Sequence, residues 1–298
     1  MTVLKYDDYL KVVEEHLLDY LPNVDKKSET IYKAMEYSVN AGGKRLRPVL
    51  VLAACDFCGG NIEEALPYAM AIEYIHTYSL IHDDLPCIDN DDLRRGKPTN
   101  HKVFGEAMAV LAGDGLLNSA YEAMHKDMLN NMENLSDLQR RVKATEVIGN
   151  VAGCYGMVAG QVSDIEAEGT KCSAEMLDYI HSYKTGAMIR GAVAAGAYLG
   201  GADEKTFEDL KKYAANIGLA FQICDDILDV TGTTEELGKE VGHDQLAEKS
   251  TYPSIFGMEY SQKKLDELNG EAVEIMEKYG DKAEFFINLV EKLAKRRK

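Results

Sequence analysis

The sequence predicts an all-α fold, a single bundle of roughly ten or more helices with a helix-lined interior. Alanine, leucine, methionine, glutamate and lysine dominate the chain, and apolar residues recur at helical spacing almost throughout its 298 residues. Glycine or proline interrupts this pattern repeatedly, and no sustained period-two segment predicts a sheet. A chain of this length can bury a substantial core, and without a linker, repeat or low-complexity stretch we expect one domain over residues 1–298.

Three stretches carry the helical pattern most clearly. In the first, apolar residues at helical spacing lead into the acidic sequence DDLPCID at 83–89. The positions that continue this pattern are Leu66, Ala69, Met70, Ile72, Glu73, His76 and Leu80. In the second, AMIRGAVAAGAYLG at 187–200, small residues at close intervals allow a neighbouring helix to approach closely. The third ends in DDILD at 225–229, so both acidic sequences lie at the ends of apolar helical stretches.

The composition disfavours several classes of protein. The chain has 50 acidic against 33 basic residues, which disfavours nucleic acid as a partner. Its start, MTVLKYDDYLKVVEEHLL, lacks the basic and apolar regions of a signal peptide, and no apolar run reaches transmembrane length. The six cysteines are scattered, and Cys55 and Cys58 have no second pair or nearby histidine, so we interpret these two as helix-packing thiols. We therefore expect a cytoplasmic protein.

The two aspartate clusters are the most informative feature of the chain. Asp225 and Asp229 are four residues apart, so on a helix they project from one face, where like charges repel unless something positive neutralises them. Carboxylates without cysteine or paired histidine suit Mg²⁺, which takes one or two of them and completes its shell with water and phosphate oxygens. Two such clusters facing each other would hold a phosphorylated ligand. Solvated acidic helix ends are the alternative, which the apolar flanks disfavour.

Pro86 interrupts the first cluster. It cannot donate a hydrogen bond to the carbonyl of His82, and its ring disfavours a straight continuation of the helix. On a straight helix Asp83 and Asp89 would point about 240° apart. A break at Pro86 lets Asp89 return toward Asp83, so the sequence predicts a ligand-binding loop here.

Basic residues cluster where an anion site needs them. The sequence GGKRLRP places Lys44, Arg45 and Arg47 after two glycines and before a new helix, whose N-terminus favours anions. Arg94 and Arg95 directly follow the acidic DNDD, where a charge-balanced surface turn is the alternative. Further basic candidates are Lys184, Lys239 and Lys249.

These motifs resemble those of the trans-isoprenyl diphosphate synthase (polyprenyl synthetase) family. The matching sequences are GGKRLRP, the stretch from EYIHTYSLIHDD to AVLAGD at 73–114, KTG at 184–186, and FQICDDILD at 221–229 with the following GK. They run in order through residues 42–253 and are long and specific. The resemblance implies an isoprenoid synthase fold, a single all-α bundle around a deep central cavity, usually homodimeric. It also implies a prenyltransferase that acts on isopentenyl diphosphate and allylic diphosphates.

The resemblance implies roles for individual residues as well. Asp83, Asp89 and Asp225 would bind three Mg²⁺ ions that grip the allylic diphosphate, with Asp84 and Asp229 as helpers. The other contacts divide between the two diphosphates and the reacting carbons. Arg94, Lys184 and Lys239 would contact the allylic diphosphate; Lys44, Arg47, His76 and Arg95 would hold isopentenyl diphosphate; and Thr185 and Gln222 would lie beside the reacting carbons.

The implied reaction is ionisation, condensation and proton loss. Metal ions and cationic side chains would neutralise the leaving diphosphate, and the allylic cation would need nearby dipoles and exclusion of water. The side-chain oxygens of Thr185 and Gln222 and the carbonyl of Lys184 suit that role, and the departed diphosphate would remove the proton. Such a site has no general base, and we interpret His82, beside Asp83, as a packing or supporting residue.

Product length depends on residues before the first cluster. Tyr78 and Ser79 lie about 6–7.5 Å from Asp83 along the helix, where the growing hydrocarbon would run. A tyrosine at this position, with the insertion of Pro86 and Cys87, resembles bacterial farnesyl diphosphate synthases and favours a fifteen-carbon product. The flanking DDLPCIDNDDLRRGKPTNHKVFGE also resembles plant-type geranylgeranyl diphosphate synthases, so a twenty-carbon product is the alternative.

Other classes of protein are less compatible with these motifs. A metal phosphohydrolase would need further histidine ligands, and a terpene cyclase would leave the second diphosphate site unused. A non-catalytic subunit of a heteromeric prenyl synthase would typically lack one aspartate cluster, and this chain has both. The basic C-terminus, KRRK at 295–298, either closes over the isopentenyl site or is a solvated tail.

Overall fold

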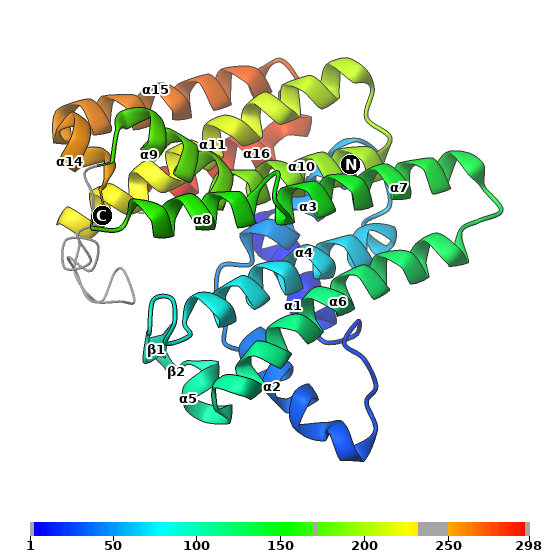
Figure 1. Ribbon diagram of the computed structural model, residues 1–298. Helices are drawn as coiled ribbons and strands as arrows, with labels where there is room; N and C mark the ends of the chain where they lie inside the picture. Colours follow the sequence, from blue (N-terminus) through cyan, green and yellow to red (C-terminus); the bar gives the residue numbers. More distant parts are fainter. Residues whose placement is uncertain (1–2, 170–171, 232–249, 296–298) are drawn as a thin grey trace.

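The protein is all-α, as predicted (Figure 1). The computed structural model describes residues 3–169, 172–231 and 250–295. The α-helices in these ranges are α1 (Tyr6–His16), α2 (Glu29–Val39), α3 (Leu46–Phe57), α4 (Ile62–Asp83), α5 (Asn100–Phe104), α6 (Glu106–Asn130), α7 (Leu135–Ala152), α8 (Met157–Ala167), α9 (Ala174–Ile180), α10 (Ala187–Gly200), α11 (Glu204–Thr231), α14 (Tyr252–Phe256), α15 (Met258–Glu277) and α16 (Glu284–Ala294). Two 3₁₀ segments, η1 (Lys26–Ser28) and η3 (Gly280–Ala283), and one π-helix, η2 (His181–Gly186), complete the helical elements. The strands of the described ranges, β1 (Leu93–Arg94) and β2 (Lys97–Pro98), pair as a short antiparallel ribbon.

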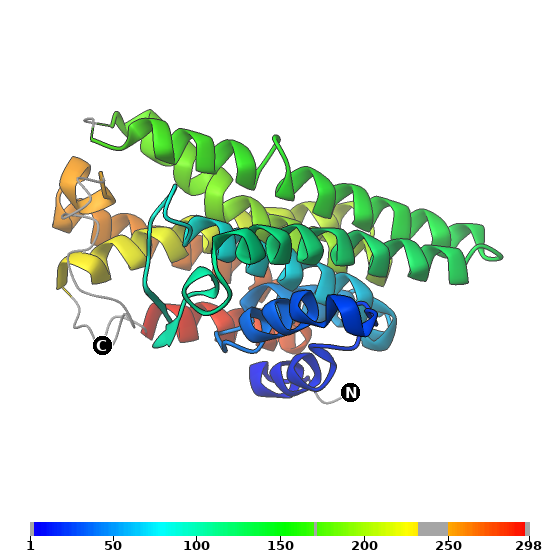
Figure 2. The same cartoon turned by 60° about the horizontal axis from the view of Figure 1, so that its bottom comes forward.

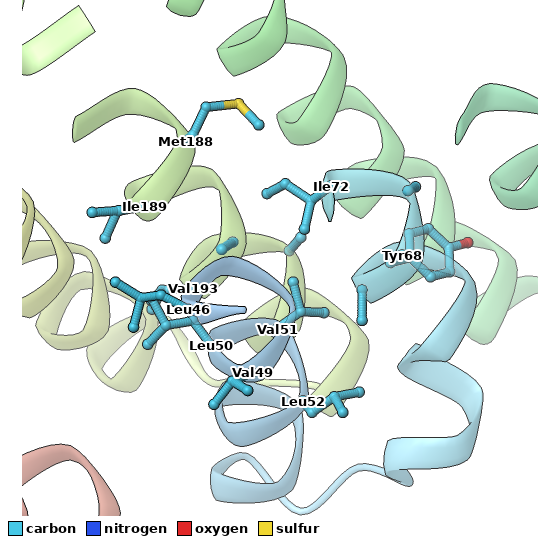
Figure 3. Packing of buried hydrophobic residues seen from close by; sticks show 14 of the residues in the cluster. Leu46, Val49, Leu50, Val51, Leu52, Tyr68, Ile72, Met188, Ile189 and Val193 are labelled. Carbon is cyan, nitrogen blue, oxygen red and sulfur yellow. The ribbon is translucent and has the colours of Figure 1, made fainter. Parts of the chain in front are cut away.

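Helix α3 lies within the larger of two buried clusters. Its sequence LRPVLVLAACDF is apolar on nearly every side, which is typical of a helix that other helices surround. Figure 3 shows Leu50 and Val51 of α3 between Ile189 and Val193 of α10 on one side and Ile72 of α4 on the other. The same cluster contains buried side chains of both α1 and α16, so helices near the two ends of the chain share one core.

Small residues let α10 pack closely against α3. A Cβ atom at Gly196 would lie 2.2 Å from the carbonyl oxygen of Val51, and one at Gly200 would lie 2.5 Å from that of Cys55. The close approach predicted for residues in this helix is therefore confirmed. The same contact explains the cysteine pair, because the Gly200 position also lies against Cys58. Cys55 is buried in the core cluster and Cys58 packs against it, as expected of packing residues, and burial raises the pKa of both thiols to about 12.

The ends of two long helices define the functional end of the molecule. α4 ends at Asp83 and α11 ends at Thr231, and both views place these ends on the side of the molecule that carries the β1–β2 ribbon (Figures 1 and 2). The π-helix η2 packs against both α8 and α11. The fold therefore brings the two acidic clusters and the KTG sequence to one region.

Two of the sequence features lie partly or wholly beyond these ranges. Lys239 and Lys249 are outside the described residues. Of the basic C-terminus, Lys295 is described and pairs with Glu291 at 3.3 Å, one helical turn earlier. No helix within the described ranges is long and apolar enough to cross a membrane.

Candidate active site

The first aspartate cluster folds back on itself, as the position of Pro86 predicts. Helix α4 ends at Asp83, and the backbone N–H of Asp89 donates to the carbonyl of Asp83 at 2.9 Å. Asn90 completes the turn with a φ of 53°, a left-handed conformation that asparagine tolerates better than most residues. The loop therefore returns Asp89 to the end of the helix that carries Asp83, so the predicted return is confirmed.

The carboxyl group of Asp83 lies at the meeting point of several predicted site residues. Burial raises its pKa from 3.8 to about 6. Lys184 and Arg94 are close enough to oppose this rise, whereas the negative charges of Asp89 and Asp84 add to it. The structure thus brings acidic residues of the first cluster together with a lysine of η2 and an arginine of the ribbon.

Asp84 and Arg94 bind each other. The Nε of Arg94 donates to Oδ1 and Oδ2 of Asp84 at 2.7 and 2.9 Å, and its Nη2 donates to Oδ1 as well. Asp84 is almost fully buried, and Asp91 lies 3.5 Å from the same guanidinium. This fork holds Arg94 beside the end of α4 and places its charge near Asp83.

The glycine-rich loop between α2 and α3 receives Arg95. The guanidinium of Arg95 lies directly over Gly43, where a Cβ atom would be 2.5 Å from Cζ, and its Nη1 donates to the carbonyl of Gly42. Only glycine fits at position 43 without displacing the arginine. Lys44 follows, with its Nζ 5.9 Å from the centre of the Phe221 ring of α11. Lys44 and Arg95, both predicted to hold isopentenyl diphosphate, therefore lie in the same loop region.

His76 lies among arginines and is neutral at physiological pH. Burial is the main reason that its pKa falls well below 6.5, and the nearby positive charges lower it further. These charges belong, in order of effect, to Arg47, Arg95, Arg94 and Arg45. A neutral imidazole can donate one hydrogen bond there without adding to the positive charge.

Arg47 reaches the interior from the first turn of α3. Its Nε is buried and has no hydrogen-bond partner within the described part of the chain. Burial lowers the pKa of Arg47 to about 10, Glu73 and Asp225 oppose that change, and Arg95 adds to it. A buried guanidinium nitrogen without a partner, beside a second arginine, is a site that an anion would satisfy.

Arg45 is the exception in the basic loop. The sequence groups it with Lys44 and Arg47 as an anion-binding residue, but its guanidinium is buried in ion pairs with Glu14 and Glu73, each at 2.8 Å. The expectation that Arg45 presents its charge to a ligand is therefore wrong. The physical reason is that a buried carboxylate from α4 already occupies the guanidinium.

The KTG sequence forms the second half of the π-helix η2. Such single-turn widenings are frequent at functional sites. Lys184 pairs with Asp164 of α8 at 2.6 Å, and α8 is packed so closely that a Cβ at Gly160 would lie 2.2 Å from the backbone nitrogen of Lys184. Sequence reasoning missed Asp164 because a single aspartate in a helix has no partner at a recognisable spacing.

Thr185 and Gln222 are carried by elements in contact. A Cβ at Gly218 of α11 would lie 3.3 Å from the Cα of Gly186, so the end of η2 rests on α11 one turn before Gln222. Both Thr185 and Gln222 are half-buried. The packing of η2 on α11 therefore explains how the predicted neighbours of the reacting carbons come from distant parts of the sequence.

The second aspartate cluster continues α11. Asp225 lies near enough to Arg47 to affect its pKa, and Asp229 is buried, with 1% of its surface exposed. Between them, Asp226 accepts a hydrogen bond from the backbone N–H of Tyr252 at 2.7 Å and lies 3.4 Å from Nε2 of His181. Asp226, which the sequence does not single out, thus connects α11 to the starts of α14 and η2.

Helix α4 carries the residues predicted to set product length. Tyr78 is 8% exposed, and its ring packs edge-on against His82 with 5.7 Å between centroids. Burial raises the pKa of Tyr78 to about 12, with smaller effects from Tyr121 and Asp83. The hydroxyl of Ser79 donates to the carbonyl of His76 at 2.9 Å, so it is turned toward its own helix.

His82 is a packing residue, as predicted. Its Nε2 lies 3.1 Å from the carbonyl oxygen of Val110, to which it donates a hydrogen bond. A Cβ at Gly113 of α6 would lie 2.0 Å from the same nitrogen, so the imidazole fills the place of a side chain there. These contacts place the ring between α4 and α6.

Comparisons with known proteins agree with this geometry. Residues 28–286 match the family model described as Polyprenyl synthetase. The farnesyl diphosphate synthase of Geobacillus stearothermophilus is 48% identical over 260 residues, which cover 86% of this chain and 84% of that protein. The geranylgeranyl diphosphate synthase of Cyanophora paradoxa is 46% identical over 274 residues, which cover 92% and 89%. The crystal structure of an FPP/GFPP synthase from Zymomonas mobilis is 34% identical and matches with a TM-score of 0.84 over 96% of both chains.

The fold and the site together define a prenyltransferase of the isoprenoid synthase type. The chain belongs to the polyprenyl synthetase family and is a short-chain trans-prenyl diphosphate synthase. Farnesyl and geranylgeranyl diphosphate synthases occur among its relatives at similar identity.

Proposed function

We propose that the protein condenses isopentenyl diphosphate with dimethylallyl and geranyl diphosphate to give farnesyl diphosphate. The observation that carries this proposal is the buried ring of Tyr78, about 7.5 Å from Asp83 along α4. A diphosphate bound at the aspartates would direct its hydrocarbon back along this helix. The ring of Tyr78 is packed against His82, and there it would fill space that a fourth isoprene unit needs.

Isopentenyl diphosphate is assigned to the basic loop region. Arg47 offers a buried donor without a partner, and His76 offers a neutral imidazole among arginines. Lys44 and Arg95 add charge from the rim of the same region, where both are exposed. Arginine forks and a lysine point charge suit a diphosphate, and the local basic cluster outweighs the acidic balance of the whole chain.

The allylic diphosphate is assigned to the acidic clusters and the cations beside them. Arg94 and Lys184 already lie close to Asp83, and Lys239 is proposed to join them. The donor set fits Mg²⁺, because it consists of carboxylates, the oxygen ligands that Mg²⁺ prefers beside water and phosphate. Asp83, Asp89 and Asp225 would hold Mg²⁺, with Asp84 and Asp229 in support. Bound Mg²⁺ would neutralise charge on the departing diphosphate.

The chain's own groups guide the reaction between the two sites. Lys184 and Arg94 would stabilise the leaving diphosphate as its charge grows. The oxygens of Thr185 and Gln222, and the carbonyl of Lys184, would point dipoles at the allylic cation while the packed helices exclude water. Isopentenyl diphosphate, held on the other side, would attack the cation. The departed diphosphate would then accept the proton.

A product assay tests this function. Purified protein with Mg²⁺ and labelled isopentenyl diphosphate is incubated separately with dimethylallyl, geranyl and farnesyl diphosphate, and the dephosphorylated products are separated by chromatography. We expect farnesol from the first two primers and no extension of the third. Geranylgeraniol as the main product would instead support the alternative, a geranylgeranyl diphosphate synthase. No incorporation from any primer would contradict a catalytic role and favour a non-catalytic subunit.

We also propose that the protein acts as a cytoplasmic homodimer. Leu111 on α6 and Val162 on α8 are apolar and about half exposed, so a second copy would remove unfavourable surface from water. Sedimentation equilibrium measures the mass directly. A chain that remains monomeric at micromolar concentration would contradict this part of the proposal.

A further inference from the structure

Arg45 is held in an unusual backbone conformation by buried polar contacts. It precedes the first residue of α3 and has a φ of 51°, in the left-handed region. Its side chain is 1% exposed, and each part of the guanidinium has a partner. Nε donates to Glu14 at 2.8 Å, Nη1 to Glu73 at 2.8 Å, and Nη2 to the carbonyl of Val39 at 2.7 Å. A non-glycine residue keeps this conformation only when its surroundings fix it.

The conformation of Arg45 determines where its neighbours point. Lys44, which precedes Arg45, is exposed and lies over Phe221, while Arg47, two residues after it, lies in the first turn of α3 with a buried Nε. Gly43, on the other side of Lys44, supports the guanidinium of Arg95. Lys44 and Arg47, two of the groups assigned to isopentenyl diphosphate, therefore flank Arg45 directly, and a third, Arg95, rests on the same loop.

Glu73 is the buried partner of this anchor. It is 1% exposed and lies on α4 three residues before His76, on the same face of the helix. It also interacts with Arg47 and Arg95, which lie farther away than Arg45. The buried carboxylate of Glu73 thus links the loop before α3 to α4, which carries His76. Separating Arg45 from Glu73 would leave a buried charge without compensation, which is strongly unfavourable. The pair therefore holds the loop against α4.

We propose that Arg45 is a positioning residue for the isopentenyl diphosphate site, which acts through its buried pair with Glu73 and does not touch the substrate. This inference rests on the proposed function. Asp83, Arg94 and Lys184, which are assigned to the allylic diphosphate, lie at the end of α4, in β1 and in η2, whereas the hydrogen bonds of Arg45 go to Glu14, Glu73 and Val39. Disturbing Arg45 should therefore weaken one substrate and spare the other, which a general loss of stability would not do.

Arg45→Lys tests the proposal. Lysine keeps the positive charge, but its ammonium group cannot reproduce the planar geometry in which Nε, Nη1 and Nη2 donate to three separate partners. We expect the KM for isopentenyl diphosphate to rise about tenfold, the equivalent of about 1.4 kcal/mol. The KM for geranyl diphosphate and kcat at saturation should stay within about twofold of the parent values, a difference of less than about 0.5 kcal/mol. An unchanged KM for isopentenyl diphosphate, or a parallel rise for both substrates, would overturn the inference.

A matched pair of surface variants keeps the test decisive if Arg45→Lys folds poorly. Glu14 is 46% exposed and contacts Arg45, whereas the adjacent Glu15 is exposed and pairs with Lys11 instead. Glu14→Gln should raise the KM for isopentenyl diphosphate about threefold, since one charge-assisted hydrogen bond is weakened, and Glu15→Gln should leave it unchanged. Identical behaviour of the two variants would overturn the inference. A parent protein that incorporates no isopentenyl diphosphate would contradict the proposed function itself, whereas an active parent with an unaffected Arg45→Lys variant contradicts only the role of Arg45.

Discussion

The carboxyl group of Asp83 is charged at neutral pH in surroundings that disfavour the charge, so its neutral isostere should stabilise the metal-free protein. Burial raises the pKa of this group from 3.8 to about 6 even though Lys184 and Arg94 oppose the change. At about 1.36 kcal/mol for each pH unit, the difference corresponds to about 3 kcal/mol. Asp83→Asn removes this cost and should remove activity with it, because a proposed metal ligand is lost.

The pH dependence has a definite sign. Below the unfolded pKa of 3.8 the carboxyl is protonated in both states and costs nothing. As the pH rises through the folded value of about 6, the folded state must carry an unfavourable charge and stability is lost. The advantage of Asp83→Asn should therefore be full at about pH 8 and fall to about 1 kcal/mol at about pH 4.5.

Thermal unfolding in the presence of a chelator measures the effect. A gain of about 3 kcal/mol corresponds to roughly 5–10 °C in a chain of this size. Asp92→Asn is the control, because Asp92 is exposed, pairs with Lys102 at 2.7 Å and has a lowered pKa, so its loss should leave stability unchanged or slightly reduced. An Asp83→Asn protein that melts no higher than the parent at about pH 8, or whose gain does not shrink on acidification, would refute the reasoning.

Three further predictions concern turnover and product. Asp225→Ala should lower turnover by orders of magnitude, measured as incorporation of labelled isopentenyl diphosphate; unchanged turnover would remove Asp225 from the proposed metal site. Lys44→Ala should chiefly raise the KM for isopentenyl diphosphate and Lys239→Ala that for the allylic substrate, each by about 1.5–3 kcal/mol; a rise for the same substrate in both would show that the two sites are wrongly assigned. Tyr78→Ala should lengthen the product. If chromatography finds the same chain length, another residue limits the length of the product.

The sequence predicted features that depend on neighbours along the chain. The return of Asp89 to Asp83 follows from Pro86 and local hydrogen bonding, and the close contact at α10 follows from the small residues of that helix. The packing role of His82 also agreed, because the reaction implied by the motifs left it without a proton to transfer.

Features that depend on distant partners were not predictable in the same way. The role of Arg45 is set by Glu14 and Glu73, which come from two other helices. Asp164 reaches Lys184 only because glycine lets α8 approach η2. In each case the two partners are far apart in the sequence and are brought together by tertiary packing. No regular spacing along the chain therefore identifies the acidic residue in advance.

The β1–β2 ribbon links the two proposed diphosphate sites. Arg94 forks onto Asp84 at the end of α4, and the next residue, Arg95, turns with a φ of 53° onto Gly42. Lys97 donates to the carbonyl of Asn40 at 3.3 Å, and so ties the far strand to the same loop. In the proposed function, these adjacent arginines of one short ribbon would therefore bind different substrates. Because Asp84 holds Arg94 and the glycine-rich loop holds Arg95, each arginine is fixed by an element that also carries other groups of its own proposed site.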